Sequence, residues 1–537
     1  MSNNDKIDVG LVEQARPSLP GFKTELVEEA RIAAEQEAQM TLIEGIKKYP
    51  KAVMWSALLS TALVMEGFDM AFMGSLISLP QFDRKFGREV NGNWQLTAAW
   101  QTGLSNGSAC GEILGLLMCG VIAERFGSRS LMIGALVFIT GAIFIPFFCT
   151  NIQMLLGGEI LIGLSWGALQ TVTNVYAAEV CPVVLRAYLT TYVQMCWIIG
   201  NIISAVALRA IDTIQSDRGY KIGFALQWIW PVPLIIGIYF APESPWWLVR
   251  RNRPDDAMKS LKRLTSNQSE EELQNTLALI IHTTRLENEI RQGTSYLDCF
   301  KGTDLRRTEI TMMVYLSLGI SGTTLLGYST YFMEQAGLSS EWAFDLSIVQ
   351  FCLGFIGLVC CWFTMKYVGR KTIFLSGLIS LGAGLLIIGI LGTVHQTSAV
   401  SWAIGVMLLF LTFSYDGAIA PLIYALCSEI PSGRLRQKTV VLSRAFYFCG
   451  LIVCNVLTPY QLNPTAWNWG AKTGFFWCGI DVICIIYIYF RLPEPKGRSY
   501  AELDMLFEMK VPARKFKTTE VNPFSISEIE NAMVKAE

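Results

Sequence analysis

The sequence predicts an all-α membrane protein whose twelve transmembrane helices form two six-helix halves. Three observations support this fold class. The 537 residues are 52% hydrophobic and only 16% charged, whereas soluble domains carry roughly 25% charged residues. The apolar residues gather in long blocks, and about 20 such residues cross a bilayer as a helix. In addition, loop motifs in the first half of the chain recur at matching places in the second half.

The chain begins with a polar N-terminal tail, residues 1–51. This tail mixes acidic and basic side chains and has no apolar core followed by small residues, which a signal peptide would need. We therefore expect the tail to remain in the cytoplasm.

Twelve apolar segments follow in two groups of six. The first group forms the N-terminal half, 52–241, with spans near 52–79, 99–123, 131–149, 154–177, 189–211 and 222–240. A charged segment, 242–307, must lie in water and is predicted to be a cytoplasmic helical loop. The C-terminal half, 308–491, has spans near 310–332, 342–367, 372–394, 399–427, 440–460 and 473–490, and a cytoplasmic tail, 492–537, ends the chain.

Basic residues predict the orientation, because short loops rich in lysine and arginine stay in the cytoplasm. On one predicted side lie the central loop and the basic residues Arg125, Arg129, Arg186, Lys366, Arg370, Lys371, Arg434, Arg436, Lys438, Arg491, Lys496 and Arg498. We assign that side, and with it both termini, to the cytoplasm. One loop disagrees, since Arg84, Lys85 and Arg88 follow the first span on the opposite side.

Two loop motifs are repeated between the halves, which indicates a duplicated six-helix unit. Each motif combines carboxylates with arginines at helix ends, where such groups pair strongly. We interpret them as a cytoplasmic latch that holds the halves together; the alternative is that the arginines only set the membrane topology. The residues of the predicted latch are Glu124, Arg125, Arg129, Glu179 and Arg186 in the first half, and Arg370, Glu429 and Arg434 in the second.

Several ionisable residues fall inside predicted spans. A charge at the centre of a span costs about 2.5–3.5 kcal/mol even on lenient scales, so such residues are functional candidates. They are Glu66, Asp69, Glu112, Glu159, Asp416 and Arg444. One cation among several acids is an unbalanced set, and a carboxyl that gains and loses a proton would suit proton-coupled transport. The alternative is that Arg444 permanently neutralises one acid.

The chain resembles the sugar porter family of the major facilitator superfamily, and within it the fungal maltose-type α-glucoside permeases. The wider resemblance rests on 124–129 (ERFGSR), 242–248 (PESPWWL), 369–371 (GRK) and 493–498 (PEPKGR). The narrower one rests on 66–69 (EGFD), 189–192 (LTTY), 327–332 (GYSTYF), 428–436 (SEIPSGRLR) and 507–516 (FEMKVPARKF). The resemblance spans the chain from about residue 50 to residue 516.

This resemblance implies the major facilitator fold and a proton-coupled importer of α-glucosides in a fungal plasma membrane. The implied proton-coupling residues are Glu66, Asp69, Glu112 and Arg444. Glu159 stands where many members of the family have an arginine that pairs with the first-span aspartate. Arg444 is inferred to take over part of the role of that missing arginine. The implied sugar-binding residues are Gln194, Thr324, Tyr328, Tyr424 and Tyr447, with Tyr331 as a further tyrosine of the seventh span. For each tyrosine the alternative is packing at the membrane interface or between helices. Leu318 and Thr324 replace amides of a hexose site, which favours a disaccharide.

Other functions are disfavoured by composition. The formal net charge is −1 and there is no basic stripe, which argues against nucleic-acid binding. With two histidines and no CxxC spacing, the sequence offers little for a metal centre or a His-based enzyme, and no cofactor is expected. The expected partners are a small sugar, protons and membrane lipid, with the chain acting as a monomer. A proton-independent hexose facilitator and a transporter-like sugar sensor remain open as alternatives.

Overall fold

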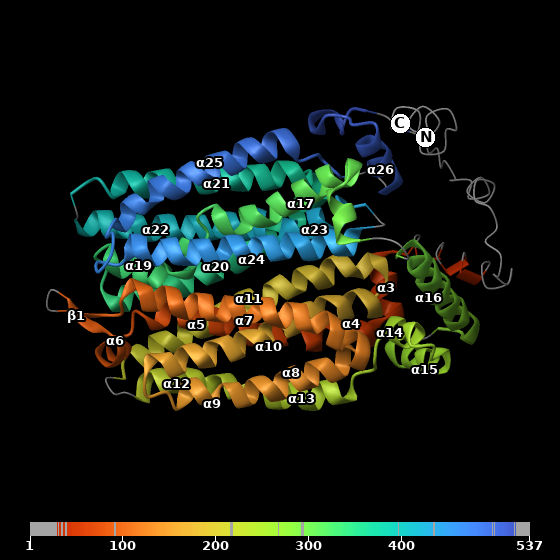
Figure 1. The fold of residues 1–537 in the computed structure, drawn as a ribbon, viewed down its shortest axis with the longest axis horizontal. Coiled ribbons are helices and arrows are strands. Elements are labelled where there is room, and N and C mark those ends of the chain that lie inside the picture. The colour runs from red at the N-terminus through yellow and green to blue at the C-terminus, as the bar shows by residue number, and fades with distance from the viewer. Residues whose placement is uncertain are drawn as a thin grey trace.

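The computed structural model describes residues 40–519 apart from short gaps at 91–92, 215–217, 267, 292–294, 396, 433–434, 497 and 499, together with 29–30, 32–33, 36–37 and 521. Most of the predicted N-terminal tail and the last part of the C-terminal tail lie outside the described residues. The described chain is almost entirely helical, and its one sheet is the short antiparallel hairpin β1–β2 (Figure 1).

The N-terminal half lies along one side of the molecule in Figure 1. Its elements are α3 (Leu42–Lys48), α4 (Pro50–Ser60), α5 (Ala62–Leu76), α6 (Pro80–Phe86), β1 (Arg88–Val90), β2 (Asn93–Gln95), α7 (Ala98–Phe126), α8 (Ser128–Ala142), α9 (Phe144–Phe147), α10 (Ile152–Val180), α11 (Val183–Asp212), α12 (Arg218–Leu226), η1 (Gln227–Ile229) and α13 (Pro231–Phe240). The segment predicted as a helical loop then forms α14 (Pro245–Arg250), α15 (Pro254–Leu264), α16 (Glu270–Arg291) and η2 (Tyr296–Phe300).

The C-terminal half lies along the other side of the molecule. Its elements are α17 (Gly302–Ile320), α18 (Thr324–Gly327), α19 (Ser329–Gln335), α20 (Ser340–Tyr367), α21 (Arg370–Leu391), α22 (Ser398–Ser414), η3 (Tyr415–Ile419), α23 (Ala420–Glu429), α24 (Arg436–Leu462), η4 (Gly470–Lys472) and α25 (Thr473–Arg491), followed by α26 (Tyr500–Glu508) and η5 (Ala513–Lys515). We call the end of the bundle with α6, β1 and α19 the α6 end, and the end with α3, α14–α16 and α26 the α14 end (Figure 1).

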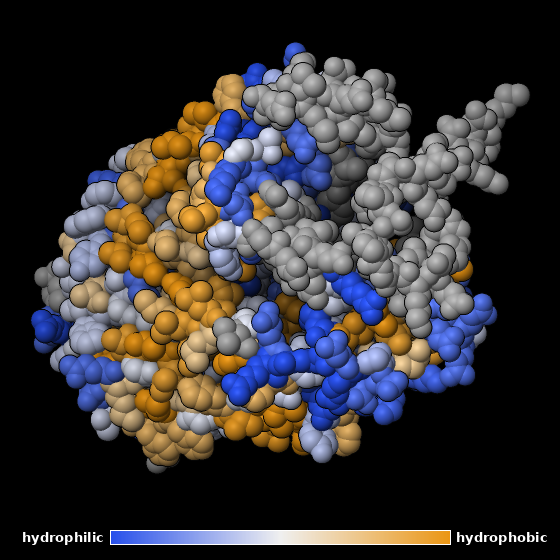
Figure 2. All heavy atoms as spheres, turned by 45° about the vertical axis from the view of Figure 1, so that its right-hand side comes forward, coloured by the Kyte–Doolittle hydropathy of each residue, from blue (hydrophilic) through white to orange (hydrophobic). Residues whose placement is uncertain are grey.

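Eleven stretches among the described residues are long and apolar enough to cross a membrane. The remaining helix of the predicted twelve is α7, which has 29 residues but is not among the eleven; it carries polar residues such as Asn106 and Glu112. Figure 2 shows apolar side chains gathered over the long helices and hydrophilic ones gathered towards the α14 end. This surface fits a bundle with its apolar band in lipid.

Glycines let the helices of the N-terminal half touch backbone to backbone. A Cβ atom added at Gly111 or Gly115 on α7 would overlap the carbonyl oxygen of Ile160 or Leu164 on α10. A Cβ atom at Gly67 on α5 would likewise overlap the carbonyl oxygen of Trp197 on α11. Small residues at such crossings are how helices associate closely in lipid. The close contact fixes the positions of the polar side chains on these four helices.

Two helical segments of the C-terminal half are interrupted part-way along. The segment formed by α17, α18 and α19 breaks near Gly322, whose φ of +89° is in a region that favours glycine. The segment formed by α22 and α23 contains the π-helical turn η3, which places Asp416 on the buried side. Such interruptions are frequent at functional sites. Both segments contribute residues to the cavity described below.

The two halves meet through polar contacts at the α6 end. Arg209 of α11 forms an ion pair with Asp345 of α20 at 2.7 Å. Asn463 of the C-terminal half donates to the carbonyl oxygen of Leu96 at 2.8 Å, and Ser75 lies 3.0 Å from Thr330. These contacts close the seam between the halves at this end.

Candidate functional site

A cavity of about 360 Å³ lies between the two halves. Its wall is built from α5, α7, α10 and α11 of one half and α17, α18, α20, α22–α24 and η3 of the other. A volume of this order suits a small ligand. Five of the six intramembrane charged residues singled out in the sequence line this one cavity: Asp69, Glu112, Glu159, Asp416 and Arg444. The sixth, Glu66, is fully buried close by on α5.

Asp69 is held by two hydrogen bonds inside the N-terminal half. The indole nitrogen of Trp166 on α10 donates to one carboxylate oxygen at 3.1 Å, and the amide nitrogen of Gln227 donates to the other at 2.7 Å. Trp166 and Gln227 are themselves fully buried. The side chain therefore has a fixed orientation, with both oxygens occupied as acceptors.

The other acids of this half are less completely bonded. Glu66 accepts a hydrogen bond from Gln170 of α10, and Glu112 accepts a long one, 3.4 Å, from Ser108. Both carboxyl oxygens of Glu159 are buried without a hydrogen-bond partner. A buried polar group without a partner is costly, so these acids are points where a proton or a ligand hydroxyl would be stabilised.

Arg444 approaches the acids from the C-terminal half. It lies on α24 and lines the same cavity as Glu112, and it acts electrostatically on both Glu66 and Glu112. Within the part of the chain that the structure describes, no ion pair shorter than 4.0 Å joins Arg444 to these acids. The arginine thus faces the acids across the cavity in this conformation.

The predicted sugar-binding residues all line the cavity. Gln194 on α11 lies beside Asp416. The hydroxyl of Thr324 is 2.9 Å from that of Thr458, and the hydroxyl of Tyr328 is 2.5 Å from that of Ser105 across the seam. Tyr424 and Tyr447 complete the predicted set. Tyr331 differs, because it lines a separate cavity at the α6 end.

The cavity is also lined by polar residues that were not predicted from the sequence to belong to the site. Trp197 and Asn201 follow Gln194 on α11, and Asn455 lies on the face of α24 that carries Arg444. Gln350 on α20 is fully buried and its carbonyl oxygen has no partner. Helical spacing from Gln194 and Arg444 pointed to the first three, whereas nothing in the sequence marked Gln350.

One buried acid lies away from the cavity. Asp481 on α25 is fully buried, and neither carboxyl oxygen has a hydrogen-bond partner. A Cβ atom at Gly382 on α21 would come to 2.5 Å from it. The sequence signal was available, because Asp481 interrupts the apolar run 473–490.

The predicted latch residues lie at the α14 end, and the ion pairs that the structure shows for them stay within one half or reach the loop helices. Glu179 pairs with Arg250 of α14 at 2.6 Å, and Arg370 pairs with Glu429 at 3.5 Å. Glu124, Arg125 and Arg129 surround the α7–α8 turn; the carbonyl oxygens of Glu124 and Arg125 accept from Arg251. Arg434 and the side chain of Arg186 lie outside what the structure describes.

Two glutamates that sequence reasoning left without a role occupy equivalent places in the two halves. The carboxylate of Glu243 accepts from the backbone N–H of Ser128 at 3.1 Å and of Arg129 at 3.3 Å, at the start of α8. The carboxylate of Glu494 accepts from the backbone N–H of Arg370 and Lys371 at 2.9 and 3.1 Å, at the start of α21.

These two contacts extend the repeat seen in the sequence. Anions at helix N-termini are stabilised by the free N–H groups and the helix dipole. Burial nevertheless raises the pKa of Glu243, and the hydrogen bonds from Ser244, Arg129 and Ser128 partly oppose that rise. The contacts tie the end of each six-helix half to its own loop motif.

A membrane bundle with two related halves, and with a cavity between them that charged and polar side chains help to line, defines a solute transporter that works by exposing the cavity to alternate sides. The sequence model of the family described as "Sugar (and other) transporter" matches residues 55–507. The chain belongs to this family of transporters.

Yeast relatives cover most of the chain. A general alpha-glucoside permease of Saccharomyces cerevisiae is 44% identical over 504 residues, covering 93% of this chain and 82% of its own length. The maltose permease MAL31 of the same species is 42% identical over 516 residues, covering 94% and 84%.

Solved structures show the same fold. The xylose transporter XylE from E. coli, in a partially occluded inward-open conformation, gives a TM-score of 0.67 at 19% identity and covers 84% of this chain and 99% of that one. The proton:xylose symporter XylE bound to a bromo-deoxyglucose gives 0.68 at 18% identity, covering 86% and 100%. The predicted major facilitator fold is therefore confirmed.

Proposed function

We propose that this transporter imports α-glucosides, with maltose-like disaccharides as substrates, in symport with protons. The main observation in support of this proposal is the composition of the cavity between the two halves. One wall holds the carboxyl groups of Asp69, Glu112 and Glu159, and the opposite wall holds Arg444. The names of the yeast relatives, alpha-glucoside and maltose permease, support the substrate class.

Proton coupling follows from the placement of the charges on different halves. Glu66, Asp69 and Glu112 belong to α5 and α7, whereas Arg444 belongs to α24. When the halves rock against each other, the distance between the cation and the acids changes. Proton binding then depends on which side the cavity faces. A permanent salt bridge with Arg444 would remove this dependence, and the structure shows none within 4.0 Å among the described acids of the cavity.

Sugar recognition needs polar groups for the hydroxyls and aromatic faces for the apolar side of the ring. The cavity supplies both. Gln194, Asn201 and Asn455 provide amides, and Tyr424 and Tyr447 provide aromatic rings. Leu318 and Thr324 also line it, and their small or apolar side chains leave room for a second sugar ring.

The proposal places the protein in a fungal plasma membrane with the α14 end in the cytoplasm. The basic loop residues support this orientation, as does the position of α3 and α26, which lie at the same end (Figure 1). Two of the three basic residues that disagreed have local contacts at this end: Lys85 donates to the hydroxyl of Tyr220 at 2.5 Å, and Arg84 lines the cavity at the α6 end. The seam that is closed at the α6 end then faces the outside of the cell. The cavity lies within one chain, which supports action as a monomer.

The test is uptake of labelled maltose, sucrose, trehalose and glucose into yeast cells that lack their own permeases. We expect concentrative uptake of maltose-like sugars that alkalinises the medium and collapses with an uncoupler. Excess glucose should compete poorly. Uptake that ignores the uncoupler would overturn the symport mechanism in favour of a facilitator, and a signalling response without uptake would favour a sensor.

A further inference from the structure

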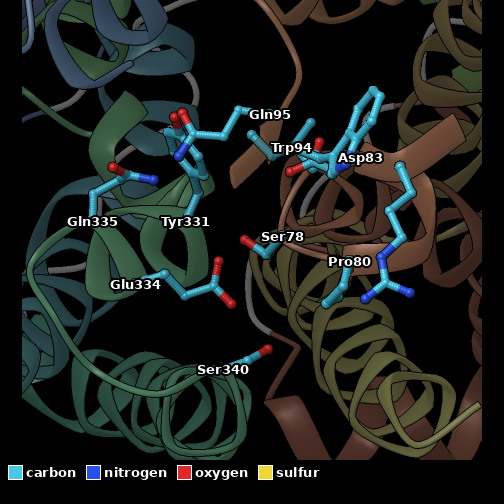
Figure 3. A pocket seen from close by; sticks show the side chains of 11 residues that line it. Ser78, Pro80, Asp83, Trp94, Gln95, Tyr331, Glu334, Gln335 and Ser340 are labelled. Atoms are coloured by element: carbon cyan, nitrogen blue, oxygen red, sulfur yellow. The ribbon is translucent and has the colours of Figure 1, made fainter. Parts of the chain in front are cut away.

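A second cavity lies at the α6 end, away from the central cavity. Its volume is about 340 Å³, close to that of the central one. One wall comes from the N-terminal half, with Ser78, Asp83, Trp94 and Gln95, and the other from the C-terminal half, with Tyr331, Glu334, Gln335 and Ser340 (Figure 3). None of these residues lines the central cavity.

Several polar atoms of this α6-end cavity are buried and unpaired. Ser78 is 6% exposed and Tyr331 is 3% exposed, and neither hydroxyl makes a hydrogen bond of ordinary length and angle, although the Ser78 hydroxyl is near the carboxyl group of Glu334 and the Tyr331 hydroxyl is near Gln101. The amide oxygen of Gln95 is also buried and unpaired. Figure 3 shows the Ser78 hydroxyl turned towards the carboxyl group of Glu334, with Ser340 facing the same space. Unpaired groups of this kind cost free energy unless a ligand or water satisfies them.

The chemistry of the wall matches a neutral polyhydroxyl ligand. Hydroxyls, amides and carboxyl groups surround the space, and Trp94, which is 46% exposed on the β1–β2 hairpin, offers an aromatic face at its edge. Trp presents a large apolar surface together with a polar edge. This combination is the one expected for a sugar, whose ring has hydroxyls around its rim and an apolar face.

The acids of this cavity do not favour a cation. Burial raises the pKa of Asp83 to about 7, opposed in part by the hydrogen bond from the Leu96 N–H. Burial also raises the pKa of Glu334 to about 8; the hydroxyls of Ser340 and Ser78 oppose this rise, while the charges of Asp83 and Asp212 add to it. In a mildly acidic medium the carboxyl groups of Asp83 and Glu334 are thus largely neutral. Arg84, which also lines the cavity, is positively charged and would repel a bound cation. Neutral carboxyl groups can both donate to and accept from sugar hydroxyls.

We propose that the α6-end cavity is a second binding site for an α-glucoside, separate from the central site and complete only while the halves are closed at this end. The inference rests on the proposed import of α-glucosides. Because both halves supply its walls, a bound sugar stabilises this closed arrangement and delays reopening. External sugar at high concentration therefore slows its own uptake.

The experiment counts maltose molecules bound to the purified full-length protein in nanodiscs by calorimetry. We expect two sites in the parent and one detectable site in the double variant Trp94→Ala, Gln95→Ala. In this variant the affinity of the α6-end cavity for maltose should fall at least about tenfold. Trp467→Ala is the matched control, because Trp467 is 50% exposed and does not line the cavity; it should keep two sites. Gln194→Ala should weaken only the central site.

Uptake in cells gives a second readout. The initial rate in the parent should decline at high external maltose, whereas the double variant should show no decline and an unchanged KM. A single site in the parent, equal stoichiometry in parent and double variant, or loss of both sites in Gln194→Ala would overturn the proposal. These results leave import itself intact, whereas a parent that transports no glucoside would overturn the proposed function.

Discussion

Replacing Asp69 by asparagine and by alanine should separate the role of its charge from the role of its hydrogen bonds. In asparagine, the amide oxygen can accept from the Trp166 indole. The new NH₂ group can donate to the carbonyl oxygen of Gln227, which is unpaired in the structure, once that amide turns over. The asparagine variant therefore keeps the network but has no group that can take up and release a proton.

Alanine at this position can neither accept the two hydrogen bonds nor bind a proton. Two buried donors, the Trp166 indole N–H and the Gln227 amide, lose their acceptor. A buried unsatisfied donor costs about 1–3 kcal/mol, so Asp69→Ala should lose about 2–6 kcal/mol of stability. We expect Asp69→Asn to melt near the parent, to carry sugar downhill, and to reach an inside-to-outside sugar ratio close to one.

The assays are melting of the detergent-solubilised protein and maltose accumulation with and without an uncoupler, at matched surface expression. Asp255→Asn, on the exposed surface of α15, is the control that changes a carboxylate outside the membrane and should behave as the parent in both assays. Full, uncoupler-sensitive accumulation by Asp69→Asn would refute the coupling role. Melting of Asp69→Asn as low as that of Asp69→Ala would refute the hydrogen-bond argument.

Two further predictions concern packing and pH. Gly167→Ala on α10 places a Cβ atom against the carbonyl oxygen of Glu112 and should lower the free energy of unfolding by about 1–3 kcal/mol. At Gly157 on the same helix an added Cβ atom meets nothing within 4 Å, so Gly157→Ala should raise the free energy of unfolding by up to about 1 kcal/mol. Equal melting temperatures of the two variants would contradict the close crossing of α7 and α10. Because burial raises the pKa of Glu334 to about 8, its protonated form stabilises the structure at acidic pH, and this contribution should be lost as the pH rises through that value. Glu334→Gln should flatten the decline in melting temperature between about pH 5 and pH 8, unlike Glu89→Gln on the exposed hairpin; an unchanged decline would contradict the burial argument.

The sequence predicted most of what depends on local pattern. Apolar runs of sufficient length can only be helices in lipid, and the duplicated loop motifs indicated two related halves. The acids inside the predicted spans could be recognised as functional candidates because a charged group inside the membrane is energetically costly. Asp69, Glu112, Glu159 and Asp416 line one cavity in the structure. Arg444 and Tyr447 are three residues apart, a spacing that puts both on one face of α24, and both line this cavity.

Other features depended on contacts between distant segments. No pattern in the sequence indicated that Trp166 and Gln227 would bond Asp69, because they lie 97 and 158 residues away from it. Glu243 and Glu494 could not be recognised as partners of α8 and α21 for the same reason. Tyr328 and Tyr331 are three residues apart, yet the break between α17 and α19 directs them into different cavities.

Hydrophobicity, charge and periodicity are properties of a chain segment, so the sequence by itself determined the membrane class, the two halves and the family of this transporter. The hydrogen-bond partners of Glu66 and Asp69 depend on how the helices of one half pack together, and the closure of the α6 end and the second cavity there depend on how the two halves meet across the seam. Only the tertiary structure decided these features, because each of them joins residues that lie 97 or more positions apart in the chain.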